Sequence, residues 1–329
     1  MSGVRGVGVA ESRIILCPGQ GAQFVGMARA WIEKSADARR VFEHAESLLG
    51  DRLGAPLRTL CFDGPADTLN RTDISQPAIY VTSVACWRGL LGAWGFGNGE
   101  AGVLASAGLS LGEYTALHIA GAFSFEDGLE LVTLRGRAMQ DAAEASAGGM
   151  LALIGPDDSQ AQSICDEARG GEVLVCANFN APGQVVLSGH KSACERADKV
   201  AQAKGFRATM LPVAGAFHSP LMRPAADRLA SALRSTNISL PTHGVWSNVT
   251  GNAYPAEQSA SSADRIRESL VSQLTSPVRW VACCQGILSA FGASAPGGVH
   301  ELAPGKALSG LMRRIDRNTK VVNHDEPQT

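Results

Sequence analysis

The sequence has 329 residues, of which 45% are hydrophobic and 18% charged, and 29 lysines and arginines nearly balance 31 aspartates and glutamates. This composition is typical of a globular protein with a sizeable core, and the net charge of −2 gives no general attraction for nucleic acid. No apolar run approaches the roughly 18 residues of a membrane span, and the first residues lack the apolar stretch of a secretory signal. We therefore expect a cytoplasmic protein with no membrane partner.

The first part of the chain alternates strands and helices. Residues 13–17 (RIILC) predict a short apolar strand, the glycine-rich loop PGQGAQFVG follows it, and a helix begins at about Met27. Residues 76–95 predict a buried helix, 102–107 a central parallel strand, and 125–145 a further helix. Such alternation predicts an α/β domain with a parallel sheet. No C-x-x-C pair occurs among the eight cysteines, so we expect buried, reduced thiols and no metal.

The pattern then changes to β-α-β-β-α-β, which is the ferredoxin-like order. The predicted strands are 149–155, 173–179, 184–188 and 208–213, and the predicted helices are 157–169 and 191–204. We therefore expect a small ferredoxin-like subdomain, 146–212, inserted into a discontinuous α/β domain made of 12–145 and 213–322. Residues 219–235 return to helix, with Ser219 as the expected N-cap.

Ser110 is the first candidate for chemistry. It is the serine of Gly108-Leu-Ser-Leu-Gly112, a G-x-S-x-G sequence between a predicted strand and a predicted helix. A sharp turn at this position lifts the hydroxyl clear of the sheet, and backbone N–H groups at the helix start can receive an oxyanion. The motif alone is weak, because a tight turn with a capping serine has the same pattern. The strand before it and the helix after it favour a nucleophile.

A nucleophilic serine needs a base, and His218 is the best placed of the seven histidines. It follows an apolar strand and precedes a helix start, so it lies on a loop at the end of a strand, where α/β proteins place their sites. Arg135 is the third candidate, because its helical spacing puts it on a largely apolar face. It could form a structural ion pair, extend to solvent, or bind a substrate carboxylate with its planar fork.

Six motifs occur in order along the chain: PGQGAQ from Pro18, GLSLGEY from Gly108, RGRAMQ from Arg135, NFNAPGQ from Asn178, AFHS from Ala216 and APGK from Ala303. Together they resemble the malonyl-CoA:acyl carrier protein transacylases and the related acyltransferase domains of polyketide and animal-type fatty acid synthases. The resemblance covers about residues 12–322. It implies a hydrolase-like α/β core with a ferredoxin-like insert, which agrees with the predicted elements.

The resemblance also implies roles for single residues. Ser110 would be the nucleophile and His218 its general base, oriented by the backbone carbonyl of Gln273. Backbone N–H groups of Gln20 and Leu111 would form the oxyanion hole. The remaining implied roles concern the substrate: Arg135 would bind the malonyl carboxylate, Asn180 and Gln184 would line the coenzyme A or pantetheine cleft, and Phe217 resembles the malonyl-selecting form of its motif.

Two positions depart from the family pattern. Leu109 stands where the family usually has a histidine before the nucleophile; because that histidine is not the base, we expect catalysis to survive and the shape of the pocket to change. Cys17 replaces a more common aromatic residue, and we interpret it as packing.

The function implied by the resemblance is ping-pong transfer of a malonyl group from coenzyme A to acyl carrier protein for fatty acid synthesis. The partners would be malonyl-CoA and acyl carrier protein, with no cofactor and a monomeric state. The alternatives are an acyltransferase of a polyketide pathway or with another acyl specificity, an α/β-hydrolase esterase, and an inactive binding module. An esterase would not explain PGQGAQ or Arg135.

Overall fold

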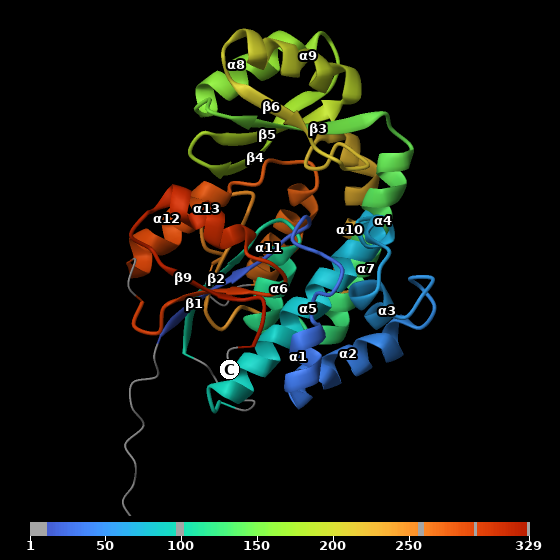
Figure 1. The fold of residues 1–329 in the computed structure, drawn as a ribbon, viewed down its shortest axis with the longest axis vertical. Helices are drawn as coiled ribbons and strands as arrows, with labels where there is room; N and C mark the ends of the chain where they lie inside the picture. Colours follow the sequence, from blue (N-terminus) through green and yellow to red (C-terminus); the bar gives the residue numbers. More distant parts are fainter. Residues whose placement is uncertain (1–11, 97–101, 256–259, 293–294, 328–329) are drawn as a thin grey trace, which may run out of the picture.

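The computed structural model describes residues 12–96, 102–255, 260–292 and 295–327. Its larger body is built on a five-stranded parallel sheet in the order β7-β2-β1-β8-β9 (Figure 1). The strands are β1 (Arg13–Cys17), β2 (Val103–Gly108), β7 (Gly244–Trp246), β8 (Val299–Leu302) and β9 (Val321–His324). The predicted α/β class with a parallel sheet is confirmed.

Strand β1 lies at the centre of this sheet and is buried on both faces. Ile15 and Cys17 belong to the core on one side, whereas Ile14 and Leu16 belong to the core on the other. Successive side chains of a strand point to opposite faces, so a continuous apolar run is what a strand covered on both sides requires.

The helices of this body divide by the core that they join. Helices α12 (Trp280–Phe291) and α13 (Ala307–Ile315) pack with Ile14 and Leu16. The others pack with Ile15: α1 (Arg29–Lys34), α2 (Ala36–Leu49), α3 (Leu57–Phe62), α4 (Ala66–Leu69), α5 (Thr72–Ala93), α6 (Gly112–Ile119), α7 (Phe125–Glu144), α10 (Arg223–Ser235) and α11 (Ala260–Gln273). The sheet is thus a middle layer between two helical layers.

Two helices differ from their predicted limits. Helix α5 begins at Thr72, about one turn before residue 76, and holds Pro77 inside it. A proline usually marks the first turn of a helix, so the sequence pattern places the start too late. The helix expected over 219–235 opens as a 3₁₀ turn, η1 (Pro220–Met222), before α10. Ser219 caps that turn, because its side chain accepts a hydrogen bond from the N–H of Leu221.

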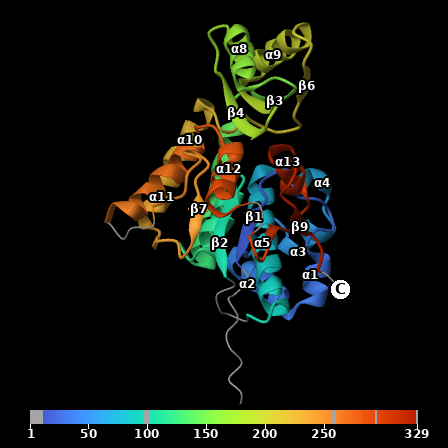
Figure 2. The same ribbon diagram turned by 90° about the vertical axis from the view of Figure 1, so that its left-hand side faces the viewer.

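The smaller sheet lies beyond one end of the larger body (Figures 1 and 2). It is antiparallel, in the order β4-β5-β3-β6, with two helices packed on it. Its elements are β3 (Gly148–Ile154), α8 (Asp158–Arg169), β4 (Leu174–Ala181), β5 (Gln184–His190), α9 (Lys191–Ala203) and β6 (Arg207–Met210). This order and these directions are the ferredoxin-like arrangement that the β-α-β-β-α-β pattern predicts.

Main-chain hydrogen bonds also join the small sheet to the larger body. The N–H of Phe179 in β4 donates to the carbonyl of Val278 (2.9 Å), and the N–H of Val278 donates to the carbonyl of Ala177 (2.8 Å). Val278 lies between α11 and α12, so β4 is joined to the segment that connects these two helices. Within the described ranges, no helix has the length and apolar character needed to span a membrane.

Candidate active site

Ser110 occupies the sharp turn between β2 and α6, with a positive φ of 54°. The turn depends on its two flanking glycines. A Cβ atom added at Gly108 would lie 1.8 Å from the backbone of Gly112, and one added at Gly112 would lie 2.1 Å from the carbonyl oxygen of Cys17. The G-x-S-x-G spacing is therefore required by the close approach of strand, turn and helix, as in a nucleophile elbow.

Asn248 fixes this turn from the neighbouring strand. Its Oδ1 accepts a hydrogen bond from the N–H of Ser110 (2.6 Å), and its Nδ2 donates to the carbonyl of Gly108 (2.8 Å). The side chain is fully buried. Asn248 belongs to none of the six motifs; the available signal was its place just after β7, at the carboxyl end of a parallel strand.

His218 lies against the serine. Its Nε2 is 2.8 Å from Oγ of Ser110, and its Nδ1 is 2.7 Å from the carbonyl oxygen of Gln273. A carbonyl only accepts, so Nδ1 carries the proton and Nε2 presents its lone pair to the serine hydroxyl. Burial, together with the charge of Arg135, lowers the pKa of His218 to about 4, against the raising effect of the bond to Gln273. The imidazole is therefore neutral and able to accept a proton.

Arg135 is buried beside the same hydroxyl. Its Nη2 donates to Oγ of Ser110 (3.0 Å) and Oε1 of Gln273 (2.9 Å), and its Nη1 donates to Oε1 of Gln76 (2.7 Å). Its guanidinium also lies 5.4 Å from the ring centre of Tyr114. Across the described ranges, Arg135 makes no ion pair with an aspartate or glutamate, and it is only 1% exposed. The two structural alternatives, an ion pair and extension to solvent, are thus absent.

One buried carboxylate lies behind these groups. Glu113, in the first turn of α6, accepts hydrogen bonds from Nε2 of Gln273 (2.6 Å), the N–H of Asn248 (3.2 Å) and the hydroxyl of Tyr254. Burial raises the pKa of Glu113 to about 7, against the lowering effect of these three bonds and of Arg135. Neither Glu113 nor Tyr254 was identified from the sequence: Glu113 belongs to the GLSLGEY motif without a role assigned to it there, and Tyr254 belongs to none of the six motifs.

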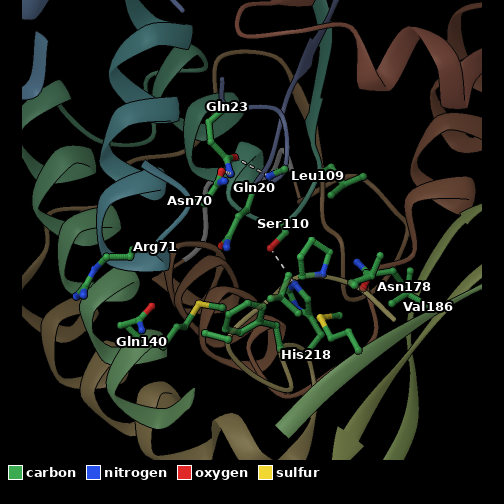
Figure 3. A pocket seen from close by; sticks show the side chains of 18 of the residues that line it. Gln20, Gln23, Asn70, Arg71, Leu109, Ser110, Gln140, Asn178, Val186 and His218 are labelled. Carbon is green, nitrogen blue, oxygen red and sulfur yellow. Dashed lines mark hydrogen bonds between the residues drawn. The ribbon is translucent and has the colours of Figure 1, made fainter. Parts of the chain in front are cut away.

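A cleft of about 650 Å³ opens onto the serine (Figure 3). Of the predicted site residues, Ser110, His218, Gln20, Asn180 and Phe217 line it. The Oδ1 atom of Asn180 is buried with no hydrogen-bond partner within the described part of the chain, so it can accept a bond from a ligand N–H.

Other predicted residues are not among those that line the cleft. Gln184, the first residue of β5, does not line it; Arg135 and Gln273 do not line it either, but both donate hydrogen bonds to Ser110. Leu109, which departs from the family pattern, is half-buried and forms part of the apolar wall. It presents no titratable group next to the nucleophile.

The loop that holds Gln20 lies directly against the elbow. A Cβ atom added at Gly19 would lie 2.1 Å from the carbonyl oxygen of Leu109, so only glycine permits this approach. The backbone N–H groups of Gln20 and Leu111 donate no hydrogen bond to the described residues. Two such donors beside a serine hydroxyl are suited to an oxyanion that develops in the cleft.

The site has the groups that acyl transfer needs. They are a neutral histidine that accepts a hydrogen bond from a serine, a helix start next to that serine, and a buried guanidinium beside it. The model of one protein family, described as the acyl transferase domain, matches residues 14–305. The chain belongs to the acyl transferase family.

Individual family members agree over nearly the full length. The chain is 41% identical over 299 residues to the malonyl CoA-acyl carrier protein transacylase of Salmonella typhimurium, with 91% of each chain covered. It is 37% identical over 320 residues to the human mitochondrial protein of the corresponding name, covering 92% of this chain and 77% of that protein. The resemblance inferred from the six motifs is therefore confirmed, and the protein is an acyltransferase.

Solved acyltransferases share the fold. The acyl-carrier-protein S-malonyltransferase of Burkholderia pseudomallei superposes with a TM-score of 0.86 at 38% identity, covering 96% of this chain and 97% of that one. A malonyl-transacylase solved in complex with a type II PKS acyl-carrier protein gives a TM-score of 0.85 at 37% identity, covering 96% of each chain.

Proposed function

We propose that this acyltransferase moves a malonyl group from coenzyme A to the phosphopantetheine thiol of an acyl carrier protein, supplying extender units for fatty acid synthesis. Oγ of Ser110 attacks the thioester carbonyl while His218 takes its proton. The tetrahedral oxyanion is held by the N–H groups of Gln20 and Leu111. Coenzyme A leaves as its thiol with the proton from His218, and an ester remains on Ser110.

The second half reverses the sequence. The carrier thiol gives its proton to His218 and attacks the ester, and the serine hydroxyl is restored. The carbonyl of Gln273 keeps His218 in the tautomer that both halves need. Asn180 and Phe217 contact the pantetheine and acyl portions in the cleft. The eight free cysteines are all buried, which fits a reducing compartment such as the cytoplasm.

The buried guanidinium of Arg135 is the observation that carries the malonyl assignment. Its hydrogen-bond partners, Ser110, Gln273 and Gln76, are all neutral, so the carboxylate of a malonyl group at Ser110 would meet a cation that is bonded to no anion. A planar fork can hold both oxygens of such a carboxylate. A neutral acyl group would leave the charge unpaired, which disfavours acetyl and long-chain substrates.

The test combines two measurements on the purified protein. Intact-protein mass spectrometry after mixing with malonyl-CoA should show a malonyl adduct, which is absent from Ser110→Ala. Adding a holo acyl carrier protein should discharge the adduct and load the carrier. An adduct that is released only to water would contradict transfer, and the lack of any adduct would contradict the nucleophile assignment.

A polyketide pathway is the second candidate, because one structural neighbour is a malonyl-transacylase bound to a type II PKS acyl-carrier protein. The chemistry at Ser110 would be the same. Comparing transfer rates to carrier proteins of the two pathways distinguishes them.

A further inference from the structure

Glu113 is a buried, charged residue for which the transfer mechanism above has no use. It is 1% exposed and lies in the first turn of α6, three residues beyond the nucleophile. Its carboxylate accepts hydrogen bonds from three donors: the Gln273 amide, the Asn248 backbone N–H and the Tyr254 hydroxyl. Three converging donors match an acceptor-only carboxylate.

The bond to Gln273 decides which way that amide points. Gln273 donates through Nε2 to Oε2 of Glu113 (2.6 Å) and to the carbonyl of Ser110 (3.0 Å). Both partners accept only, so the amide nitrogen must face them. Oε1 of Gln273 is therefore turned to Arg135, whose Nη2 donates to it at 2.9 Å. If the amide were reversed, two donors would face each other at Arg135.

The same carboxylate reaches the nucleophile turn through Asn248. Its backbone N–H is bonded to Glu113, and its side chain holds both Ser110 and Gly108. Glu113 thus contacts the two residues that fix the serine turn and the arginine, yet it touches neither the substrate cleft nor the reacting hydroxyl.

We propose that Glu113 is a positioning residue for malonyl selection. By accepting a hydrogen bond from Gln273 it sets the orientation of that amide, and the amide oxygen in turn holds the Arg135 guanidinium next to Ser110, where the acyl group binds. This proposal rests on the proposed malonyl transfer. The effect requires an acceptor at this position and does not depend on the size of the side chain alone.

Two substitutions separate orientation from packing. Glu113→Gln keeps the shape but introduces a donor, which permits Gln273 to reverse. Glu113→Asp remains acceptor-only but is one methylene shorter and leaves a gap. We expect Glu113→Gln to lower the ratio of kcat/KM for malonyl-CoA to that for acetyl-CoA by about tenfold or more, which corresponds to about 1.4 kcal/mol or more. Glu113→Asp should keep a higher malonyl-to-acetyl ratio than Glu113→Gln.

Glu301 provides a matched control. It is also a fully buried carboxylate, and it accepts hydrogen bonds from the N–H groups of Leu308 and Ser309 at the start of α13, away from the cleft. Glu301→Gln should lower the melting temperature and leave the malonyl-to-acetyl ratio unchanged. All rates are measured below the melting temperature of each variant, so that loss of folding does not enter the ratio.

The outcomes are distinguishable. If the wild-type enzyme does not prefer malonyl-CoA, the proposed function is wrong; if it does and Glu113→Gln keeps the wild-type ratio, the role of Glu113 is overturned. The role of Glu113 is also overturned if Glu301→Gln lowers the malonyl-to-acetyl ratio as much as Glu113→Gln does. The same holds if Glu113→Asp lowers this ratio more than Glu113→Gln. If Glu113→Gln does not fold, Gln273→Leu removes the side-chain link between Glu113 and Arg135 and keeps the backbone carbonyl that His218 needs. This variant should have a lower malonyl-to-acetyl ratio, and an unchanged ratio would refute the proposed link.

Discussion

Ser110 and His218 both have positive φ values, 54° and 56°, which non-glycine residues rarely adopt. Such conformations cost about 1–3 kcal/mol each and persist where the surroundings impose them. Here Asn248 bonds the N–H of Ser110 and the carbonyl of Gly108, and the Gln273 carbonyl holds the ring of His218. The dyad is therefore pre-organised before any substrate binds.

The low pKa of His218, about 4, sets the acid limit of the dyad. The active form is the neutral imidazole, so activity is lost as the pH falls through that value, well below the ordinary value of about 6.5. We expect the rate at which a neutral sulfonyl fluoride labels Ser110 to stay constant from about pH 7 to about pH 5 and to decline below that. In Arg135→Ala the decline should begin at higher pH, because the nearby positive charge is gone. A wild-type midpoint near 6.5 would contradict a neutral, buried base.

Arg135 should govern substrate choice. Arg135→Ala should lower kcat/KM for malonyl-CoA. The expected loss of transition-state stabilisation is about 2–5 kcal/mol, as for truncation of one partner of a buried charge pair. Acetyl transfer should be equal or faster, because no unpaired cation remains next to the neutral acyl group. Arg135→Lys should lose part of the activity, since an ammonium lacks the planar fork. If the malonyl-to-acetyl ratio does not fall in Arg135→Ala, the arginine has a structural role only.

At the scale of single elements, the strand–elbow–helix unit leaves no room for side chains at its glycines. Gly112→Ala would put a methyl group 2.1 Å from the carbonyl oxygen of Cys17 in β1. Backbone cannot yield as a side chain can, so we expect a lower melting temperature and little acylation of the serine. Gly310→Ala is the control, because its added methyl group meets nothing within 4 Å and α13 should gain up to about 1 kcal/mol of stability. Wild-type acylation by Gly112→Ala would show that the elbow can relax.

The same unit shows what the sequence could predict. The elbow was predictable because its steric requirement is local: five residues, two glycines, a strand before and a helix after. The apolar run of β1 and the β-α-β-β-α-β order were also readable from spacing alone. Exact limits, such as the start of α5, depended on packing that no local pattern encodes.

The network behind the serine could not be predicted in this way. Glu113 lies 135 positions from Asn248 and 160 from Gln273 along the chain, and none of the three shares a motif with another. Their side chains meet only because β7 and the end of α11 lie beside the elbow in the folded sheet. Gln184 shows the opposite case, in which a motif residue is not part of the site. It belongs to a family motif, yet its position in β5 places it outside the lining of the cleft.

For the whole molecule, the distribution of charge matters for meeting an acidic carrier protein, although the net charge is close to zero. Five exposed cations on and around α13 have no ion-pair partner within the described ranges: Lys306, Arg313, Arg314, Arg317 and Lys320. Helix α13 packs against β4, which carries Asn178 and Asn180 of the cleft. By contrast, two other exposed cations are already paired, Arg137 with Asp73 and Asp141, and Lys204 with Glu167.

We expect the Michaelis constant for the carrier protein to rise with ionic strength, because exposed charges are screened over about 10 Å at 0.1 M salt. Reversing the charge of Arg313 and Arg314 to Glu should raise this constant and leave the constant for malonyl-CoA nearly unchanged. Arg88→Glu is the control. Arg88 is exposed and lies sixteen residues along α5, roughly 24 Å at 1.5 Å per residue, from Thr72, whose hydroxyl accepts a hydrogen bond from the cleft residue Gln20. Equal effects of the two reversals would rule out docking at α13.

The main-chain bonds between β4 and Val278 bear on the construction of chimaeric acyltransferases. The small subdomain, 146–212, is joined to the larger body by two chain connections, and it could be expected to be exchangeable between relatives, as a cassette, at those two points. It has a third attachment, however, at Val278, more than sixty residues downstream and five residues after the helix that ends at Gln273. A graft that brings a foreign β4 onto the resident Val278 segment would shift the end of that helix, and with it the carbonyl that orients His218. The natural unit of exchange is therefore discontinuous, and the stretch around Val278 should be transplanted together with the cassette.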